Sequence, residues 1–216
     1  MARNLDYSLY VVTDEILSFG RTHREIAEQA TRGGASVIQL RDKTKSAREL
    51  LQIAREITEI TRQTGALSIV NDRLDIALGA GADGVHLGQD DLPITVARRL
   101  APPPFLIGIS ISSIAQAKRA EKEGADYIAV SPVFETNSKS DAGPGHGLNL
   151  LSEIAHRVQI PVLGIGGVNH ANLHHLFDAG ASGVAVISAI VSAPDINAAT
   201  RAMKEQISSL KIGSQK

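Results

Sequence analysis

A tripeptide that recurs four times along the chain limits the folds that this sequence can adopt. Glycine, alanine and then serine or aspartate stand together as Gly34-Ala35-Ser36, Gly81-Ala82-Asp83, Gly124-Ala125-Asp126 and Gly180-Ala181-Ser182. The four glycines are 47, 43 and 56 residues apart, and each tripeptide precedes a short apolar run. Glycine readily takes the left-handed conformation that ends many helices. Each repeat therefore predicts the end of a helix followed by a buried strand.

Short apolar runs also occur between the repeats, which doubles the number of expected strands. The repeats lead into strands at 37–38, 85–87, 127–130 and 184–186, and the other runs predict strands at 9–13, 67–70, 105–109 and 161–165. Helical patterns fill the gaps at 22–32, 47–63, 73–79, 93–100, 113–122, 149–158, 171–179 and 196–210. Eight strand–helix units predict an α/β protein, a single (β/α)8 TIM barrel. A doubly wound open sheet is the alternative, but no glycine-rich phosphate motif follows the first strand.

The composition indicates one domain without cysteine chemistry. No internal linker is visible, so we expect one domain over residues 1–216, with 211–216 as a disordered tail. The absence of cysteine excludes disulfides and thiolate catalysis. A net charge of −1 and 3% aromatic residues argue against nucleic acid as a partner. No signal peptide or membrane span is visible, so a cytoplasmic protein is expected, and self-association into a homo-oligomer is left open.

Three polar residues alternate along the chain at the end of the second expected strand. Gln39, Arg41 and Lys43 are two residues apart, and such side chains on a strand point to one face. In a (β/α)8 barrel this position is the carboxyl-terminal mouth, where active sites lie. Two cations without a partner would be costly there, so the pattern predicts an anion site. The alternative is a surface salt bridge, for example between Arg41 and Asp42.

Acidic residues follow the third and fourth expected strands. Asn71-Asp72 and Asp90-Asp91 each precede a helical segment, so either pair could be a helix cap. Carboxylates are also the ligands that Mg²⁺ prefers, and these would lie at the same mouth as the cations. Together, the cations and carboxylates predict a site for a polyphosphate with a divalent metal. His86, within the fourth strand, is expected to be a hydrogen-bonded core residue.

A second anion site is expected at the loops after the seventh and eighth strands. Glycines at 164–167 and the pair Ile187-Ser188 end these strands, and the backbone of such loops often binds phosphate in barrels. Tight turns are the alternative reason for the glycines. The seventeen-residue segment 131–147, after the sixth strand, carries Thr136, Ser138 and Lys139 followed by several glycines. A loop of this length predicts a clamp over a bound anion.

Over nearly its whole length the chain resembles the thiamine phosphate synthase family. The matching segments are QLRDK at 39–43, NDRLDIAL at 71–78, GVHLGQDD at 84–91, GIS at 108–110, SPVFETNSK at 131–139, GIGG at 164–167 and VIS at 186–188. The resemblance implies a transferase that couples 4-amino-5-hydroxymethyl-2-methylpyrimidine diphosphate to 4-methyl-5-(β-hydroxyethyl)thiazole phosphate. The implied products are thiamine phosphate and diphosphate, formed by a dissociative step that Mg²⁺ assists. The chain departs from the family at Ser138, where many members have Thr, at Ser131, where Gly is usual, and at Ser112, where His is frequent.

The resemblance also implies roles for individual residues. The departing diphosphate would be held by Gln39, Arg41 and Lys43, with Asn71 beside them, and Mg²⁺ by Asp72 and Asp91. Ser110 and Lys139 would contact the diphosphate or its leaving oxygen, which makes them, with Arg41, the implied catalytic residues. The thiazole phosphate would be held by Thr136, Ser138, Gly167, Ile187 and Ser188.

Three other functions fit parts of the pattern. The thiazole tautomerase paralogue shares the barrel, but it typically has His where Pro132 stands and lacks the full cation and Asn-Asp sets, so Lys43, Asp72 and Pro132 favour the synthase. A non-catalytic barrel that binds thiazole phosphate would need no metal site. A phosphate-binding isomerase of amino acid biosynthesis is the last alternative.

Overall fold

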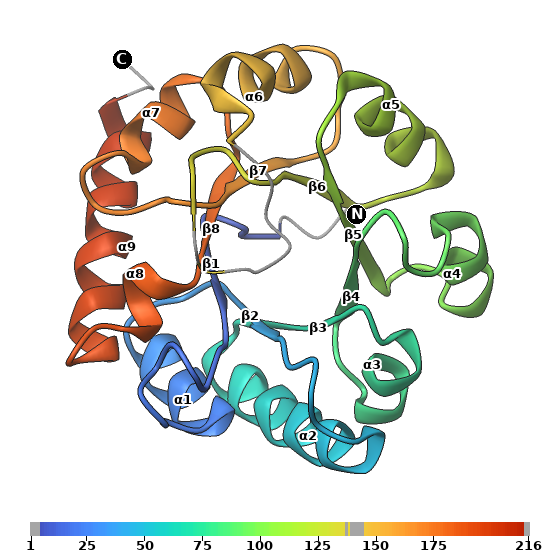
Figure 1. Cartoon of the computed structure of the whole chain (residues 1–216), viewed down its shortest axis with the longest axis vertical. Coiled ribbons are helices and arrows are strands. Elements are labelled where there is room, and N and C mark those ends of the chain that lie inside the picture. The colour runs from blue at the N-terminus through green and yellow to red at the C-terminus, as the bar shows by residue number, and fades with distance from the viewer. Residues whose placement is uncertain (1–4, 137, 139–144, 214–216) are drawn as a thin grey trace.

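Eight parallel strands close into a barrel, and helices surround it (Figure 1). The structure is a computed structural model that describes residues 5–136, 138 and 145–213. Each strand pairs with the next along the chain, and β8 pairs with β1 to close the barrel. The predicted (β/α)8 fold is therefore confirmed. That residues 1–216 form one domain stays a prediction.

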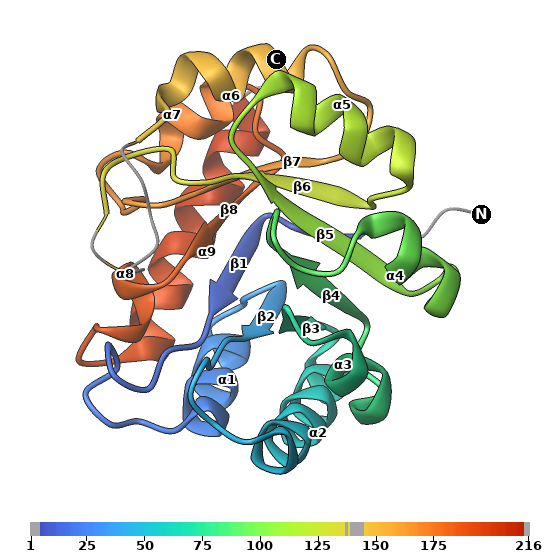
Figure 2. The ribbon, with the colours of Figure 1, turned by 45° about the vertical axis from the view of Figure 1, so that its right-hand side comes forward.

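The strands and helices follow the predicted order with shifted ends. The strands are β1 Leu9–Val12, β2 Val37–Leu40, β3 Leu67–Asn71, β4 Gly84–Leu87, β5 Leu106–Ile111, β6 Tyr127–Val130, β7 Val162–Ile165 and β8 Gly183–Val186. The helices are α1 His23–Arg32, α2 Ala47–Thr64, α3 Leu74–Ala80, α4 Ile94–Leu100, α5 Ile114–Glu123, α6 Gly147–Ala155, α7 Leu173–Asp178, α8 Ser188–Val191 and α9 Ile196–Gly213. The short α8 was not predicted; it follows β8 directly and packs on α9 (Figure 2). Helix α9 includes residues 211–213, which were expected in the tail.

The glycine repeats end helices and set the register of every second strand. Their glycines all have positive φ angles, of +96°, +66°, +95° and +94° in chain order. Each alanine donates its N–H to the carbonyl five residues earlier, at 3.0, 3.0, 3.0 and 2.9 Å, which is the bond that closes a Schellman motif. The backbone N–H of the third residue donates to a backbone carbonyl of the preceding strand. These bonds run from Ser36 to Leu9, from Asp83 to Ser68, from Asp126 to Ile107 and from Ser182 to Val162. The repeat therefore ends a helix and aligns the next strand in three residues.

Two helices near the amino terminus begin with capping boxes. Thr22 and Glu25 exchange side-chain and backbone hydrogen bonds at the start of α1, and Ser46 and Glu49 do the same for α2. Each cap satisfies backbone N–H groups that have no partner within the helix, and it stabilises the folded protein by about 1 kcal/mol. None of the helices in the described residues is long and apolar enough to cross a bilayer.

Aromatic rings fill the barrel interior below the mouth. Tyr127 of β6 is fully buried, and the centre of its ring lies 4.9 Å from that of Tyr7 and 6.0 Å from that of Tyr10. Gly108 of β5 makes room for this ring, because a Cβ there would lie 2.0 Å from Cζ of Tyr127. The filled interior leaves the loops at the carboxyl ends of the strands as the place for a binding site.

Candidate active site

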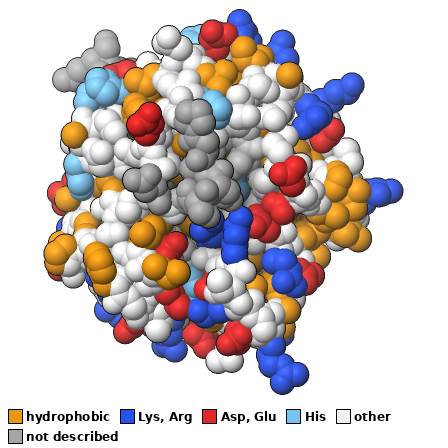
Figure 3. Space-filling model, in the orientation of Figure 1, with side chains coloured by type: hydrophobic (Ala, Val, Ile, Leu, Met, Phe, Trp, Pro, Cys, Tyr) orange, Lys and Arg blue, Asp and Glu red, His pale blue; other side chains and the backbone are white. Residues whose placement is uncertain are grey.

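A cavity of about 360 Å³ opens at the carboxyl ends of β2 to β6. Its wall includes six of the predicted site residues, Arg41, Lys43, Asn71, Asp72, Asp91 and Ser110, together with His86 and His146. In Figure 3, basic and acidic side chains adjoin one another over this end of the barrel. We call this cavity the charged pocket. Six of the residues predicted to hold a polyphosphate and its metal are thus brought together from four different strands and their loops.

The two cations of the charged pocket lie in the loop after β2 rather than on the strand. β2 ends at Leu40, so Arg41 and Lys43 follow the strand instead of belonging to it, although both side chains line the same pocket. The N–H of Arg41 points to Oγ1 of Thr13, at 3.4 Å. Nη1 of Arg41 lies 3.9 Å from Oδ2 of Asp14. Asp42, the salt-bridge partner considered from the sequence, binds His23 and Lys45.

Asn71 and Asp72 mark the end of β3 and do not cap a helix. Helix α3 has Arg73 at its N-cap position, without a side-chain hydrogen bond, so the capping interpretation is wrong. Asp72 has a φ of +61°, which is uncommon outside glycine and best tolerated by Asn and Asp. Its N–H donates to the carbonyl of His86 at 2.8 Å, which ties it to β4. The long-range backbone bond, and not a helix cap, therefore fixes the position of this carboxyl.

Asp91 is held by the loop after β4. Its Oδ2 accepts a hydrogen bond of 2.6 Å from the N–H of Gly88, whereas α4 begins at Ile94 with no side-chain cap. The capping interpretation is therefore wrong for this pair as well. Asp90 is exposed, and it lines the charged pocket beside Asp91.

The carboxyl groups of Asp72 and Asp91 contact each other. Burial, together with the hydrogen bond and the negative charge of Asp91, raises the pKa of Asp72 to about 6, although the nearby charges of Lys43 and Arg41 act to lower it. Two carboxylates this close repel each other unless a proton or a cation lies between them. Their oxygens are also the donors that suit a hard divalent cation. The residues present therefore fit Mg²⁺.

Gln39 lies one layer below the charged pocket, in a chain of hydrogen bonds through the barrel. Its Nε2 donates to the hydroxyl of Tyr10 at 2.7 Å, and that hydroxyl contacts the hydroxyl of Tyr127 at 2.9 Å. His86 continues the chain, with Nδ1 3.1 Å from the Tyr127 hydroxyl and Nε2 2.9 Å from Oγ of Ser110. His86 is thus the hydrogen-bonded core residue that was expected. Direct contact of Gln39 with a diphosphate stays a prediction.

A smaller pocket, which we call the hydroxyl pocket, lies beside the charged pocket over β6 to β8. It is lined by all five residues that the resemblance assigned to the thiazole phosphate: Thr136, Ser138, Gly167, Ile187 and Ser188. Ser138 joins two of its walls, since its Oγ lies 3.0 Å from Oγ of Ser188 and its N–H donates to Oγ1 of Thr136 at 3.2 Å. Among the described residues that line this pocket, none is charged.

The two pockets share a wall. Ser131 and Pro132, the first residues of the segment after β6, line both of them. The N–H groups of Val133 and Phe134 donate to the carbonyls of Ile165 and Gly166, at 2.7 and 3.1 Å, which fixes this wall on the end of β7. Ligands in the two pockets would therefore meet at Pro132.

The charged pocket contains a histidine that was not among the predicted site residues, and one predicted residue cannot be placed. His146 lines the pocket, and its N–H donates a hydrogen bond of 2.9 Å to the carbonyl of Pro132, which holds it there. No local sequence signal indicates this contact. Lys139, predicted at the leaving oxygen, lies outside the described residues.

A closed (β/α)8 barrel with two adjoining polar pockets at its carboxyl-terminal mouth is the arrangement of a barrel enzyme, whose active site lies at this face. The family model described as "Thiamine monophosphate synthase" matches residues 9–190, and the chain belongs to this family.

Relatives and a solved structure agree with this assignment. The chain is 56% identical over 207 residues to a thiamine-phosphate synthase of Methanoculleus marisnigri, covering 96% of this chain and 98% of the relative. It is 54% identical over 197 residues to a thiamine-phosphate synthase of Methanospirillum hungatei, with 91% and 96% covered. The structure of a thiamine phosphate pyrophosphorylase from Pyrococcus furiosus superposes with a TM-score of 0.88 at 39% identity, covering 95% of this chain and 98% of that one.

Proposed function

We propose that the protein couples 4-amino-5-hydroxymethyl-2-methylpyrimidine diphosphate to 4-methyl-5-(β-hydroxyethyl)thiazole phosphate, forming thiamine phosphate and releasing diphosphate. The observation that carries this proposal is the shared wall between the charged and hydroxyl pockets, which suits two phosphorylated substrates that must meet. The names of relatives more than 50% identical support the same reaction. The enzyme is then a transferase of thiamine biosynthesis.

The charged pocket would take the pyrimidine diphosphate. The guanidinium of Arg41 can bind two phosphate oxygens at once, and the ammonium of Lys43 adds a point charge beside it. Asn71 and Ser110 offer an amide and a hydroxyl from the ends of β3 and β5. Ser110 is oriented from below by its contact with His86, so its position does not depend on the ligand.

Asp72 and Asp91 would hold Mg²⁺ in the same pocket. The metal supplies positive charge that stabilises the departing diphosphate. The protein contributes the two carboxylates, which the backbone bonds to His86 and Gly88 keep in place.

The reaction suits a site that positions and stabilises charge without a nucleophile. The bond between the pyrimidine methylene carbon and the diphosphate oxygen breaks, and its electron pair leaves with the diphosphate. The positive charge that remains is delocalised over the aminopyrimidine. Arg41 and Lys43 stabilise the negative charge that develops on the leaving group. The hydroxyl pocket holds the thiazole phosphate so that the ring nitrogen can donate its lone pair to the methylene carbon.

The tautomerase alternative is not favoured by the hydroxyl pocket. Moving a proton on the thiazole needs an acid–base group next to the ring. The described residues that line this pocket offer hydroxyl, glycine and aliphatic groups, and Pro132 stands at the wall where the paralogue has His.

A direct assay tests the proposal. Purified protein, Mg²⁺ and both phosphorylated heterocycles should give thiamine phosphate and diphosphate in equal amounts, measured by mass spectrometry and a diphosphate-release assay. Omitting either heterocycle, or adding EDTA, should stop both signals. Binding of thiazole phosphate without product at any Mg²⁺ concentration would contradict synthase activity and would indicate a binding protein instead.

A further inference from the structure

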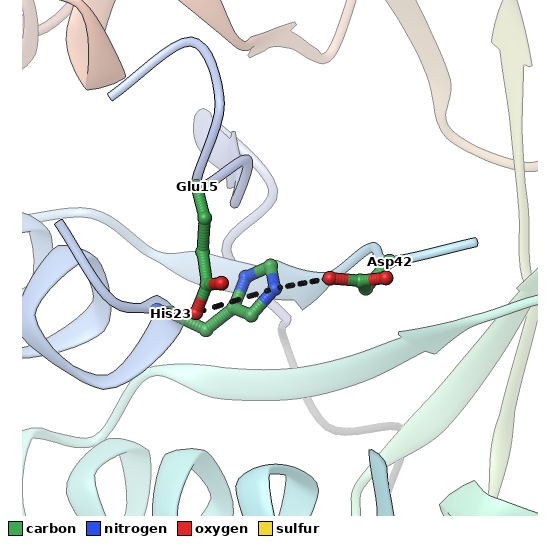
Figure 4. A group of neighbouring side chains, drawn as sticks. All are labelled: Glu15, His23 and Asp42. Atoms are coloured by element: carbon green, nitrogen blue, oxygen red, sulfur yellow. Dashed lines mark hydrogen bonds and ion pairs between the residues drawn. The ribbon is translucent and has the colours of Figure 1, made fainter. Parts of the chain in front are cut away.

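A second cluster of charged side chains lies beside the charged pocket, between the ends of β1 and β2. It consists of Glu15, His23, Asp42 and Lys45, and we call it the His23 cluster; Figure 4 shows its first three members. His23 begins α1, and its side chain is 1% exposed. Its Nε2 lies 3.1 Å from Oδ2 of Asp42 and 3.8 Å from Oε1 of Glu15. Nothing in the proposed reaction uses this buried histidine.

The cluster is closed by an ammonium group and does not call for a metal ion. The ligand atoms of Glu15, His23 and Asp42 lie within 4.8 Å of one another, as they would around a metal. Nζ of Lys45, however, already donates to Oε2 of Glu15 at 2.6 Å and to Oδ2 of Asp42 at 3.2 Å. This ammonium group contacts both carboxylates and offsets one of their two negative charges, so the cluster is already an ion-pair network without a metal ion.

Asp42 shapes the loop that carries the two pocket cations. Its Oδ1 accepts from the N–H of Thr44 at 2.7 Å and from the N–H of Lys45 at 3.0 Å, which folds the backbone around Lys43 into an Asx turn. Its Oδ2 is the atom that faces His23. Burial raises the pKa of Asp42, but the hydrogen bonds from Thr44, His23 and Lys45 outweigh burial and hold it well below the ordinary value. Asp42 is therefore a carboxylate that organises the turn from inside.

His23 connects this turn to the end of β1. Because a carboxylate only accepts hydrogen bonds, Nε2 of His23 carries a hydrogen and donates it to Asp42. Nδ1 lies 2.7 Å from Oγ1 of Thr13, and that same hydroxyl faces the N–H of Arg41 at 3.4 Å. The imidazole of His23 therefore contacts both Thr13, which faces the backbone N–H of Arg41, and Asp42, which binds the backbone N–H groups that follow Lys43.

We propose that His23 is a positioning residue for the diphosphate-binding loop: it holds Asp42 and Thr13 so that Arg41 and Lys43 face the charged pocket before substrate arrives. This inference rests on the proposed function. Two neighbouring cations repel each other, and a loop of this kind in water would spread them apart. A buried support that fixes the loop removes that cost from substrate binding. His23 does not touch the substrate, so its loss should weaken diphosphate binding and leave the hydroxyl pocket unchanged.

Titration calorimetry with inorganic pyrophosphate and Mg²⁺ tests this role without turnover. We expect His23→Leu to weaken pyrophosphate binding about tenfold, as the loss of a hydrogen bond to a charged group would do. His23→Gln, which keeps an N–H near the position of Nε2, should recover most of the affinity. In steady-state kinetics, KM should rise for the pyrimidine diphosphate and stay within about twofold for the thiazole phosphate.

Two further variants keep the test decisive. Ile26→Ala, in the buried face of the same helix, should lower the melting temperature but leave pyrophosphate affinity unchanged. Thr13→Val keeps the side-chain shape and removes the hydroxyl between His23 and Arg41, so it should weaken pyrophosphate binding even if His23→Leu does not fold. Wild-type affinity in the folded variants at positions 13 and 23, or an equal loss in Ile26→Ala, would overturn the positioning role. Wild-type protein that neither binds pyrophosphate nor forms product would instead contradict the proposed function itself.

Discussion

The charged pocket and the hydroxyl pocket are lined by different chemical groups. The charged pocket uses Arg41, Lys43 and a pair of contacting carboxyls, supplied by the loops after β2, β3 and β4. The hydroxyl pocket uses serine and threonine hydroxyls and glycine backbone after β6, β7 and β8. The wall at Ser131 and Pro132 is common to both.

The difference matches what each phosphate would do in the proposed reaction. A diphosphate that leaves gains negative charge in the transition state, so cations and a metal lower the barrier. A phosphate that only anchors the thiazole has the same charge before and after, so neutral donors suffice to bind it. Changes in the charged pocket should therefore alter kcat, and changes in the hydroxyl pocket should alter KM.

The largest effect is expected at the carboxyl pair. Asp91→Ala, or Asp72→Ala, should lower kcat by about 10³-fold or more at saturating Mg²⁺, because the charge on the leaving diphosphate is no longer balanced. Ser188→Ala, the matched change in the hydroxyl pocket, should raise KM for thiazole phosphate only about threefold, the loss of one neutral hydrogen bond. Steady-state kinetics on variants with wild-type circular dichroism measures both. Equal losses of kcat at the two positions would remove the distinction between the pockets.

The next effect is expected from the shape of one cation. Arg41→Lys keeps the charge but loses the planar fork, so kcat/KM for the pyrimidine diphosphate should fall about 100-fold. Arg48→Lys, an exposed position in α2, is the control and should have no effect. If Arg41→Lys is fully active, charge alone is sufficient at this position.

In the hydroxyl pocket the corresponding test is steric. A Cβ at Gly167, which has a φ of +64°, would lie 2.6 Å from the carbonyl oxygen of Glu135. Gly167→Ala should therefore raise KM for thiazole phosphate about tenfold, with little change for the pyrimidine diphosphate. Gly65→Ala, with a φ of +76° and no atom within 4 Å of the new Cβ, carries the same backbone strain without the collision. Gly65→Ala should lower the free energy of unfolding by about 1 kcal/mol and leave both KM values unchanged. If it changed KM as well, the effect of Gly167→Ala would come from backbone strain and not from the collision in the pocket.

The two pockets should also differ in their response to pH. Burial and the nearby Asp91 raise the pKa of Asp72 to about 6, and Mg²⁺ must displace the proton that the pair holds. Mg²⁺ affinity should therefore be full above pH 7 and fall about tenfold by pH 5, one unit below that pKa. Calorimetry with Mg²⁺ alone measures this. Equal affinity at both pH values would show that the pair does not bind the metal.

The smallest effect concerns stability without metal. Because the folded-state pKa of Asp72 is raised above its unfolded value, protonation favours the folded state, and that stability is lost as pH rises through about 6. Asp72→Asn should thus raise the melting temperature of metal-free protein by about 1–3 °C at pH 7.5 and not at pH 4. A lower melting temperature at pH 7.5 would mean that the carboxylate is satisfied by Arg41 and Lys43.

The parts of the fold that the sequence predicted are those set by local geometry. The glycine repeats end helices through bonds five residues apart, so Gly81-Ala82 or Gly124-Ala125 carries its own structural signal. The strands after them were predicted for the same reason. The short helix α8 has no such signal: it spans only Ser188–Val191 and begins without a side-chain cap.

The parts of the site that the sequence did not predict depend on contacts between distant residues. Asp72 looked like a helix cap because the cap is a local pattern, whereas its bond to the His86 carbonyl is not. Arg41 was assigned to a strand face because its spacing from Gln39 and Lys43 is a local pattern, whereas its hydrogen bond to Thr13 joins residues that are 28 positions apart. His23 has no feature in the sequence that separates it from a surface histidine, and only the folded chain brings Asp42 against it.

A crystal structure with thiamine phosphate, inorganic pyrophosphate and Mg²⁺ tests the central claim most directly. Pyrophosphate and the metal should lie between Arg41, Lys43 and the carboxyls of Asp72 and Asp91, and the phosphate of thiamine phosphate should lie against Gly167 and Ser188. Pyrophosphate in the hydroxyl pocket, or a metal bound away from both carboxyls, would contradict the assignment of the two pockets.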